Sequence, residues 1–170
     1  RGHAERLVPM VAELMEGGRA DRIAVGVGPG SFTGIRVAIA AAHGLAIGWG
    51  AELFGLSSLA LLAAGRHIQG EVAAAVTGGH GELFVQSFDA MTAEPLSELL
   101  NLPPAEAAAA IVAPVVVGSG AKLLVDARGW GEAREAWPAA ADALGLPEPL
   151  RSLPPKPVYA RAPDARAKAA

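Results

Sequence analysis

The chain has 170 residues, 52% hydrophobic and 18% charged, a composition that predicts a folded globular protein and excludes a disordered one. It has no cysteine, which excludes disulfides, thiolate metal sites and a cysteine nucleophile. The net charge of −3 is uneven, since residues 151–170 carry +4 and the first 150 residues carry −7. The negative charge of residues 1–150 argues against a self-sufficient nucleic-acid-binding surface. We interpret the basic residues 151–170 as a solvated terminus that could touch phosphate.

The first half of the chain alternates helical and strand-like patterns. Apolar residues recur at helical spacing over 3–15, which predicts an amphipathic helix. The β-branched run 23–27 predicts a buried strand, and the glycine loop 28–32 leads from it into a helix that runs to about Gly48. The run 51–54 predicts a second strand.

Hydroxyl residues mark the starts of two of these helices. Ser31 or Thr33 is predicted to cap the helix after the glycine loop. Ser57 or Ser58 is predicted to cap a short apolar helix over 59–64. The order helix, strand, helix, strand, helix predicts an α/β layered fold with parallel strand pairing.

The pattern changes after Gly70. The runs 72–76 and 83–88, joined by a glycine-rich turn, predict a β-hairpin that begins a new sheet. An alanine-rich helix over 104–111, a short strand over 115–117 and a helix over 121–127 are predicted to follow.

The last part of the chain carries weaker signals. Glu132 and Glu135 are interpreted as the solvated face of a helix. Prolines exclude a long helix near the end and predict an extended path toward Val158 and Tyr159; they are Pro147, Pro149, Pro154, Pro155 and Pro157.

The helix over 34–48 is unusually apolar. Arg36 and His43 are its polar side chains, seven residues apart and so on one stripe. The apolar stretch is too short and too punctuated by Arg36, His43 and Glu52 for a membrane span. Such a helix requires cover on more than its sheet-facing side, which predicts a partner surface and makes His43 a packed or interface residue.

The glycine loop admits two interpretations. A strand that enters a helix through small residues exposes backbone N–H groups and the positive end of the helix dipole, which suits an anion or nucleotide. The loop matches neither the Walker A pattern nor G-x-G-x-x-G, so a tight turn that needs glycine is favoured. The candidate anion-contacting residues are Gly28, Gly30, Ser31, Thr33 and Arg36.

Other catalytic patterns are missing from the sequence. The four histidines at 3, 43, 67 and 80 include no H-x-x-x-H pair, so a metal site built on helical histidine spacing is excluded. The nucleophile elbow G-x-S-x-G is also absent, which leaves serine hydrolysis without support.

One run of residues is specific enough to indicate a family. Gly26 to Arg36 reads G-V-G-P-G-S-F-T-G-I-R, and it resembles the TsaB family, also called YeaZ. Further runs that are similar to this family are His3 to Pro9, Gly44 to Ala46, Gly81 to Val85, Val117 to Ala121 and Pro157 to Ala165. The resemblance extends over almost the whole chain.

The resemblance implies an α/β fold of the ASKHA type (actin, sugar kinase and Hsp70-like, with a ribonuclease H-like core) in two lobes. We expect residues 1–69 to be the remainder of the N-terminal lobe, 70–150 the C-terminal lobe, and 151–170 a proline-rich basic tail that returns to the first lobe. The family's opening strands with a D-T-S motif have no counterpart here, so we expect them to precede Arg1. Residues 77–80 also depart from the family's D-A-R.

The function that the resemblance implies is that of a non-catalytic subunit. Such proteins pair with TsaD, which places threonylcarbamoyl on the adenosine next to the anticodon in tRNAs that read ANN codons. We expect a TsaD-like partner, a TsaE-like ATPase, tRNA contact through the complex, possible homodimers, a cytoplasmic location and no membrane. We expect no metal or cofactor, with ATP or ADP only at the shared interface. The expected interface residues are Leu7, Met10, Val11, Leu14, Ile39, His43 and Ile47.

Two alternatives stay open. The chain could be an enzyme, either an ATP-hydrolysing member of the same superfold or the glycoprotease once suggested for the family. It could also be a regulatory nucleotide binder.

Overall fold

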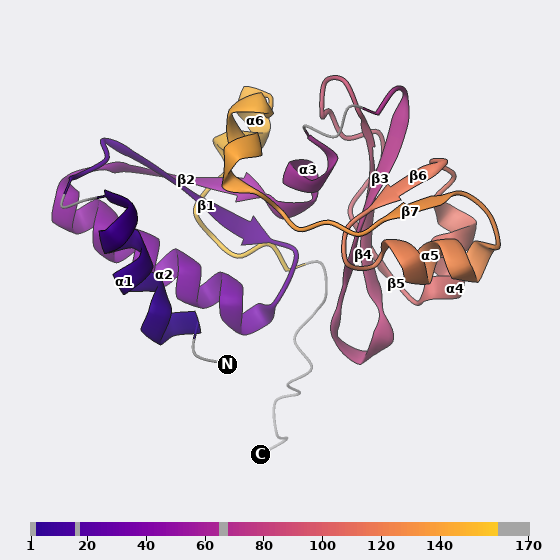
Figure 1. The fold of residues 1–170 in the computed structure, drawn as a ribbon, viewed down its shortest axis with the longest axis horizontal. Helices are drawn as coiled ribbons and strands as arrows, with labels where there is room; N and C mark the ends of the chain where they lie inside the picture. The colour runs from indigo at the N-terminus through magenta and orange to yellow at the C-terminus, as the bar shows by residue number, and fades with distance from the viewer. Residues whose placement is uncertain (1–2, 16–17, 65–67, 160–170) are drawn as a thin grey trace, which may run out of the picture.

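The structure is a computed structural model that describes residues 3–15, 18–64 and 68–159. Two β-sheets lie side by side, and a short helix, α3, lies between them (Figure 1). This arrangement confirms the predicted mixed α/β class.

The first sheet has two parallel strands, β1 (Arg22–Gly28) and β2 (Glu52–Ser57), joined by helix α2 (Phe32–Trp49). Alternate residues of β1 face α2, as the β-branched run requires. Val25 and Val27 of the strand share a core with Ile39 and Ala42 of the helix. The predicted parallel pairing is therefore confirmed.

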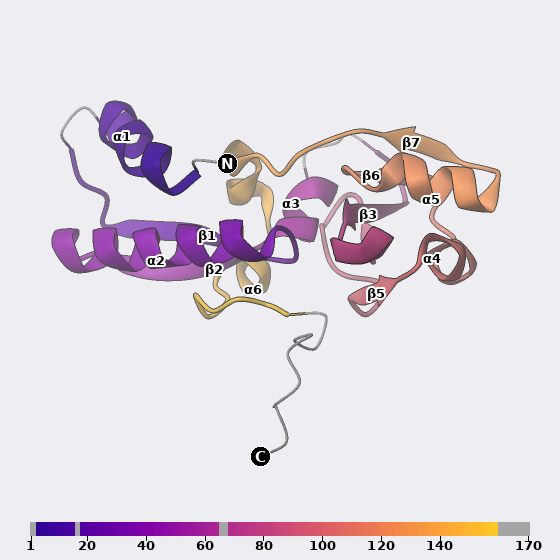
Figure 2. The same cartoon turned by 90° about the horizontal axis from the view of Figure 1, so that it is seen from below.

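Helix α1 (His3–Met15) packs against α2. Figures 1 and 2 agree that α1 and α2 lie side by side at the end of the molecule farthest from the second sheet. The two helices thus form one edge of the first lobe.

The second sheet has the strand order β5-β4-β3-β6-β7. The hairpin β3 (Glu71–Thr77) and β4 (Leu83–Asp89) is antiparallel, as the sequence predicts, and η1 (Gly79–Gly81) lies in its turn. The edge strand β5 (Leu100–Leu102) is antiparallel to β4. On the other side of β3, strands β6 (Val115–Val117) and β7 (Glu132–Arg134) run parallel to it.

Helices cover both faces of this sheet. Helices α4 (Pro104–Ala110) and α5 (Ala121–Arg128) enclose one core with Leu83, Val85 and Val116. Helix α3 (Ser58–Ala63) buries its leucines on the opposite face, against Val72, Phe88 and Val117. Although α3 follows β2 directly, it therefore shares its core with the second sheet.

Three elements differ from the expectations. Glu132 lies in strand β7 and not on a helix, and β5 was not predicted at all. After β7 the structure has η2 (Ala140–Gly145), for which no element was predicted, and the one-turn helix α6 (Glu148–Arg151), which begins the stretch where an extended path was expected. Pro147 and Pro149 are compatible with α6 because they stand before it and in its first turn, where no intrahelical N–H is needed.

Candidate functional site

The glycine loop turns the chain sharply between β1 and α2. Gly28 has φ = 110°, and a side chain there would lie 2.9 Å from Ile35 Cδ1 and 3.3 Å from the carbonyl oxygen of Val158. Only glycine meets both conditions without strain. The tight turn that the sequence favours is thus explained by the fold itself, and anion binding by the loop stays a prediction.

Ser31 is the cap of α2. Its side-chain oxygen accepts a hydrogen bond from the N–H of Gly34 at 3.3 Å, and its carbonyl accepts one from the N–H of Ile35 at 2.9 Å. Of the two predicted caps, Ser31 is right and Thr33, inside the first turn, is exposed. In the same way Ser57, and not Ser58, caps α3 through the N–H of Ala60.

The chain segment before residue 160 lies against the glycine loop and the first sheet. The N–H of Val158 donates to the carbonyl of Val27 at 2.8 Å, and Leu153 exchanges two backbone hydrogen bonds with Gly55 of β2. A side chain at Gly55 would meet the carbonyl oxygen of Pro154 at 2.7 Å. Residues 153–158 are thus held beside β1 and β2.

This contact brings together three side chains that are far apart in the sequence. The guanidinium of Arg36 lies 3.7 Å from the ring centroid of Phe32, and its Nε donates to the hydroxyl of Tyr159 at 3.0 Å. The two rings are 5.8 Å apart and inclined by 39°. We call these three residues the aromatic–arginine cluster. The sequence singled out Arg36 but not Phe32 or Tyr159 as site residues, although both lie in the runs that carry the family resemblance.

The expected interface residues divide by exposure. Ile47 is 83% exposed and Leu14 is 80% exposed, and Met10 and His43 are exposed too. Leu7 and Val11 are half-buried. The expectation for Ile39 is wrong, because it is 7% exposed and packs on β1 within the first-lobe core.

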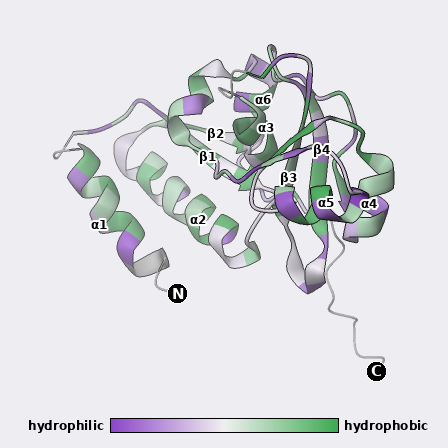
Figure 3. Ribbon diagram, turned by 45° about the vertical axis from the view of Figure 1, so that its right-hand side comes forward, coloured by the Kyte–Doolittle hydropathy of each residue, from purple (hydrophilic) through white to green (hydrophobic). Residues whose placement is uncertain are grey.

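Helix α2 has one face that contacts the sheet and one that faces outward. The sheet-facing row is Ile35, Ala38, Ile39 and Ala42. The outward row recurs at helical spacing and consists of Phe32, Arg36, Ala40, His43, Gly44, Ile47 and Gly48, all exposed. Figure 3 shows α2 coloured mainly hydrophobic along its length, beside α1. We call the part of this row from Ala40 to Gly48, together with the exposed Val8, Met10 and Leu14 of α1, the helical face.

Helix α2 has the length and composition of a membrane span, which is weak evidence because core helices of soluble proteins have the same properties. Its inner row packs on β1 and β2, so the helix is an integral part of the first lobe. In the described part of the chain, no group of three or more histidine, aspartate or glutamate side chains is arranged to hold a metal ion.

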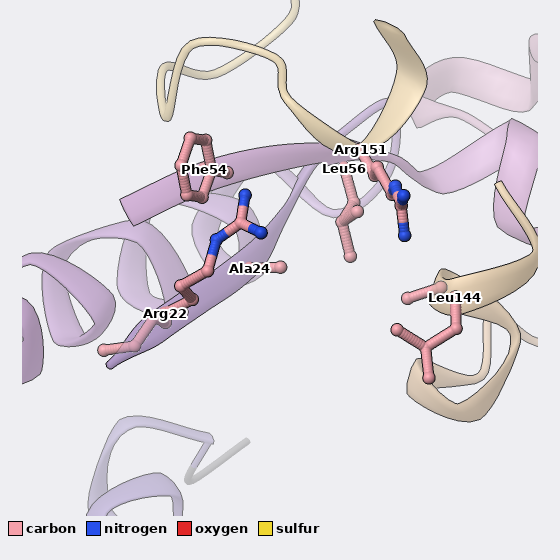
Figure 4. Close-up of a pocket in the computed structure, with 8 residues that line it drawn as sticks. Arg22, Ala24, Phe54, Leu56, Leu144 and Arg151 are labelled. Atoms are coloured by element: carbon pink, nitrogen blue, oxygen red, sulfur yellow. The ribbon is translucent and has the colours of Figure 1, made fainter. Parts of the chain in front are cut away.

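A hollow of about 260 Å³ lies near η2 and α6, with Ala24, Phe54 and Leu56 of the first sheet among its lining residues. Arg22 and Arg151 flank it (Figure 4). Both cations are compensated, since Arg22 is 3.5 Å from Glu52 and Arg151 is 2.8 Å from Glu148.

Hydrogen bonds from Ser152 and Arg151 hold the pKa of the Glu148 carboxyl below its usual value, with a smaller contribution from Arg22. The charges of the hollow are therefore already paired within the chain.

Comparison with known proteins places this geometry in a family. The family model described as TsaD, tRNA N6-adenosine threonylcarbamoyltransferase, matches residues 1–100. The chain is 35% identical over 92 residues to the tRNA threonylcarbamoyladenosine biosynthesis protein TsaB of Escherichia coli, a match that covers 49% of the chain and 40% of the relative. It is 38% identical over 68 residues to TsaB of Haemophilus influenzae, covering 37% and 29% of the two proteins. The matches thus span less than half the length of these relatives.

Solved structures agree over a larger part of the chain. YeaZ from Pseudomonas aeruginosa superposes with a TM-score of 0.77 at 27% identity, covering 92% of this chain and 84% of that one. A second structure, titled an uncharacterized protein with similarity to peptidase YEAZ from Pseudomonas aeruginosa, gives a TM-score of 0.75 at 28% identity and covers 94% and 84%. The expected ASKHA-type fold is thereby confirmed. By its family model, its relatives and its fold, the chain belongs to the TsaD-type family and, within it, to the TsaB (YeaZ) group.

Proposed function

We propose that this chain is a non-catalytic subunit in the biosynthesis of threonylcarbamoyladenosine in tRNA, and that it binds a TsaD-type subunit through the helical face. The observation that carries the proposal is the exposure of α2. Of its 18 residues, only Ile39 and Ala42 are buried. A helix of this composition normally hides most of its apolar surface.

The exposed apolar side chains point to a helical partner. Leu14 of α1 and Ile47 of α2 are four-fifths exposed, and Met10 adds a further exposed apolar group. Since α1 and α2 pack side by side, their outer surfaces can form half of a helical bundle. A second bundle half from a partner subunit or from a second copy of the chain would bury them.

Small residues in the outward row indicate close contact between helices. Ala40, Gly44 and Gly48 follow one another at intervals of four along α2. A side chain at either glycine would meet no other atom within 4 Å, so nothing in the described chain requires glycine there. Glycine in a helix interior is less favourable than alanine by about 0.5–1 kcal/mol. A closely packed partner helix explains why glycine stands at these two positions although it makes the isolated helix less stable.

The finer parts of the proposal follow from the family. The modified base is the adenosine next to the anticodon in tRNAs that read ANN codons, and a TsaE-like ATPase joins the complex. We propose a cytoplasmic location and no resident cofactor or metal, with ATP or ADP bound only where the chain meets its partner. Support for the general role comes from the relatives, which are named as tRNA threonylcarbamoyladenosine biosynthesis proteins.

Co-elution with a TsaD-type subunit in size-exclusion chromatography tests the interface. Leu14→Glu and Ile47→Glu should each weaken the complex by about 10-fold or more, because each places a charge inside an apolar contact. Leu144→Glu is the matched control: Leu144 is 84% exposed and lies in η2, outside the helical face. An intact complex with both variants, or equal weakening by the control, would exclude the helical face as the interface.

Mass spectrometry of digested tRNA tests the function. Threonylcarbamoyladenosine should appear when the chain is supplied together with the TsaD-type and TsaE-type subunits and an activated donor of the threonylcarbamoyl group, and its yield should fall with Ile47→Glu. Modification of tRNA by the chain in the absence of a TsaD-type subunit would show that the chain is itself the enzyme.

A further inference from the structure

We propose that the aromatic–arginine cluster of Phe32, Arg36 and Tyr159 is a contact site for single-stranded RNA. Phe32 is 56% exposed and Tyr159 is 50% exposed, and Arg36 is also exposed. The inference rests on the proposed function, since a tRNA is the RNA that such a complex meets. It assigns part of the RNA contact to this chain, although the acidic charge of its first 150 residues argues against a self-sufficient nucleic-acid-binding surface.

The charge of Arg36 distinguishes this cluster from the other arginine–aromatic stacks. Arg22 lies over Phe54 at 4.7 Å but is paired with Glu52. Within the described ranges, no carboxylate forms an ion pair with Arg36, whose Nε hydrogen bond goes to the neutral hydroxyl of Tyr159. Its positive charge is therefore available to a phosphate.

A third stack, at Arg128, is structural. The guanidinium lies 3.9 Å from the ring centroid of Trp130 and donates to the backbone carbonyls of Ile111, Pro114 and Trp130. The guanidinium is therefore held by backbone carbonyls, and Glu132, close to it in the sequence, pairs with Arg134 at 2.7 Å. Trp130 thus has a half-exposed ring, but the guanidinium beside it is occupied by backbone carbonyls, so a substitution of Trp130 serves as an internal control for RNA binding.

The surroundings of the aromatic–arginine cluster favour an anion. Lys156, three residues before Tyr159 in the described part of the chain, is exposed and adds a second positive charge to this segment. Bases of single-stranded RNA stack on aromatic rings and on arginine planes, and their phosphates bind arginine and lysine. Aromatic residues and arginine are also enriched at protein interfaces, so RNA binding and association with the TsaD-type subunit have to be measured separately.

The geometry also indicates which residues of the cluster contact the RNA directly and how Arg36 is positioned. Phe32 and Tyr159 offer rings on which bases stack, and Arg36 is positioned between them by its contact with Phe32 and its hydrogen bond to Tyr159. The bond between Val158 and Val27 holds Tyr159 at this place. Tyr159→Phe should therefore keep the stacking ring but release Arg36.

Fluorescence anisotropy of the purified chain with a labelled RNA hairpin that carries an anticodon loop tests the site. Phe32→Leu should weaken binding by about 10-fold, the effect of one lost base stack, while Phe32→Tyr should keep it. Arg36→Gln should reduce the slope of log K against log salt by roughly 0.7, as expected for one lost phosphate contact to a single strand. Trp130→Leu should leave both quantities unchanged.

Several outcomes would overturn the proposal. These are the absence of RNA binding by the chain, equal binding of a fully double-stranded RNA, or equal weakening by Trp130→Leu. Phe32→Leu that leaves RNA binding intact but prevents association with the TsaD-type subunit would assign the cluster to a protein interface. Circular dichroism and the thermal midpoint verify that each variant is folded, which is expected because Phe32 is more than half exposed.

The test separates this inference from the proposed function. If the complex modifies tRNA while Phe32→Leu changes neither RNA binding nor the KM for tRNA, the RNA contact is refuted and the function stands. If the chain binds RNA through Phe32 but neither forms the complex nor restores modification, the function is refuted and the contact stands.

Discussion

Gly44→Ala should make the chain more stable and its partner contact weaker. Gly44 lies in the interior of α2 on the outward row, and an added methyl group would meet no atom of the described chain within 4 Å. The substitution therefore adds helix propensity without a clash. A partner helix packed closely on Gly44 would meet the new methyl group directly.

The expected stability gain follows from the backbone alone. Alanine is favoured over glycine in a helix interior by about 0.5–1 kcal/mol, which should raise the thermal midpoint by about 1–4 °C for a protein of this size. The loss of partner affinity should be about 10-fold, comparable to overpacking a tight contact.

Gly50→Ala is the matched control for this prediction. A side chain at Gly50 also meets nothing within 4 Å, but Gly50 ends α2 with φ = 70°, where alanine is strained. This variant should lower the midpoint and leave partner affinity unchanged. Differential scanning calorimetry and titration calorimetry with the TsaD-type subunit measure the two quantities. A Gly44→Ala variant that binds the partner normally would refute the inference that a helix packs there.

Three further predictions concern the fold. Ile39→Ala should lower the free energy of unfolding, measured in urea, by about 2–5 kcal/mol, because Ile39 is buried. Ile47→Ala, on the exposed row, should change it by less than about 0.5 kcal/mol. Equal losses would contradict the assignment of the two faces of α2. Ser31→Ala should cost about 0.5–2 kcal/mol in the same assay through loss of the α2 cap, and no loss would show that the cap is dispensable. Hydrogen bonds from the backbone N–H groups of Thr92 and Met91 lower the pKa of the Asp89 carboxyl. The ionised carboxylate should therefore stabilise this turn above about pH 4, and the stabilisation should be lost as the pH falls through the lowered pKa. A carbon NMR titration that finds an ordinary or raised pKa for Asp89 would contradict this.

Helices and strands are predicted well from the sequence where one side of the element is buried, because burial requires apolar residues at regular positions. The run 23–27 is apolar because β1 is covered by α2, and Ser31 stands where a cap is needed. Strand β7, by contrast, consists of Glu132, Ala133 and Arg134, all exposed. It is a strand only because it pairs with β6, and such tertiary pairing leaves no periodic signal.

The faces of α2 show a different limit. The helix is apolar nearly all round, so its composition indicates two covered sides but not which residues lie on each. Ile39 and Ile47 are chemically identical, and only the packing on β1 shows that Ile39 belongs to the core. The aromatic–arginine cluster was equally hidden, because Arg36 and Tyr159 are 123 residues apart in the sequence.

The residues of the run Gly26 to Arg36 fall into two groups, one with a structural role and one that is exposed. Gly28, Ser31 and Ile35 have structural reasons for their identity in the turn, the cap and the first-lobe core. Phe32 and Arg36 show no such reason among the described residues, since both are exposed and their ring and hydrogen-bond contacts there are with one another and with Tyr159. Substitutions in the first group should therefore reduce function through stability. Substitutions in the second should reduce it at unchanged stability, which makes the exposed residues of the run the ones that report on binding.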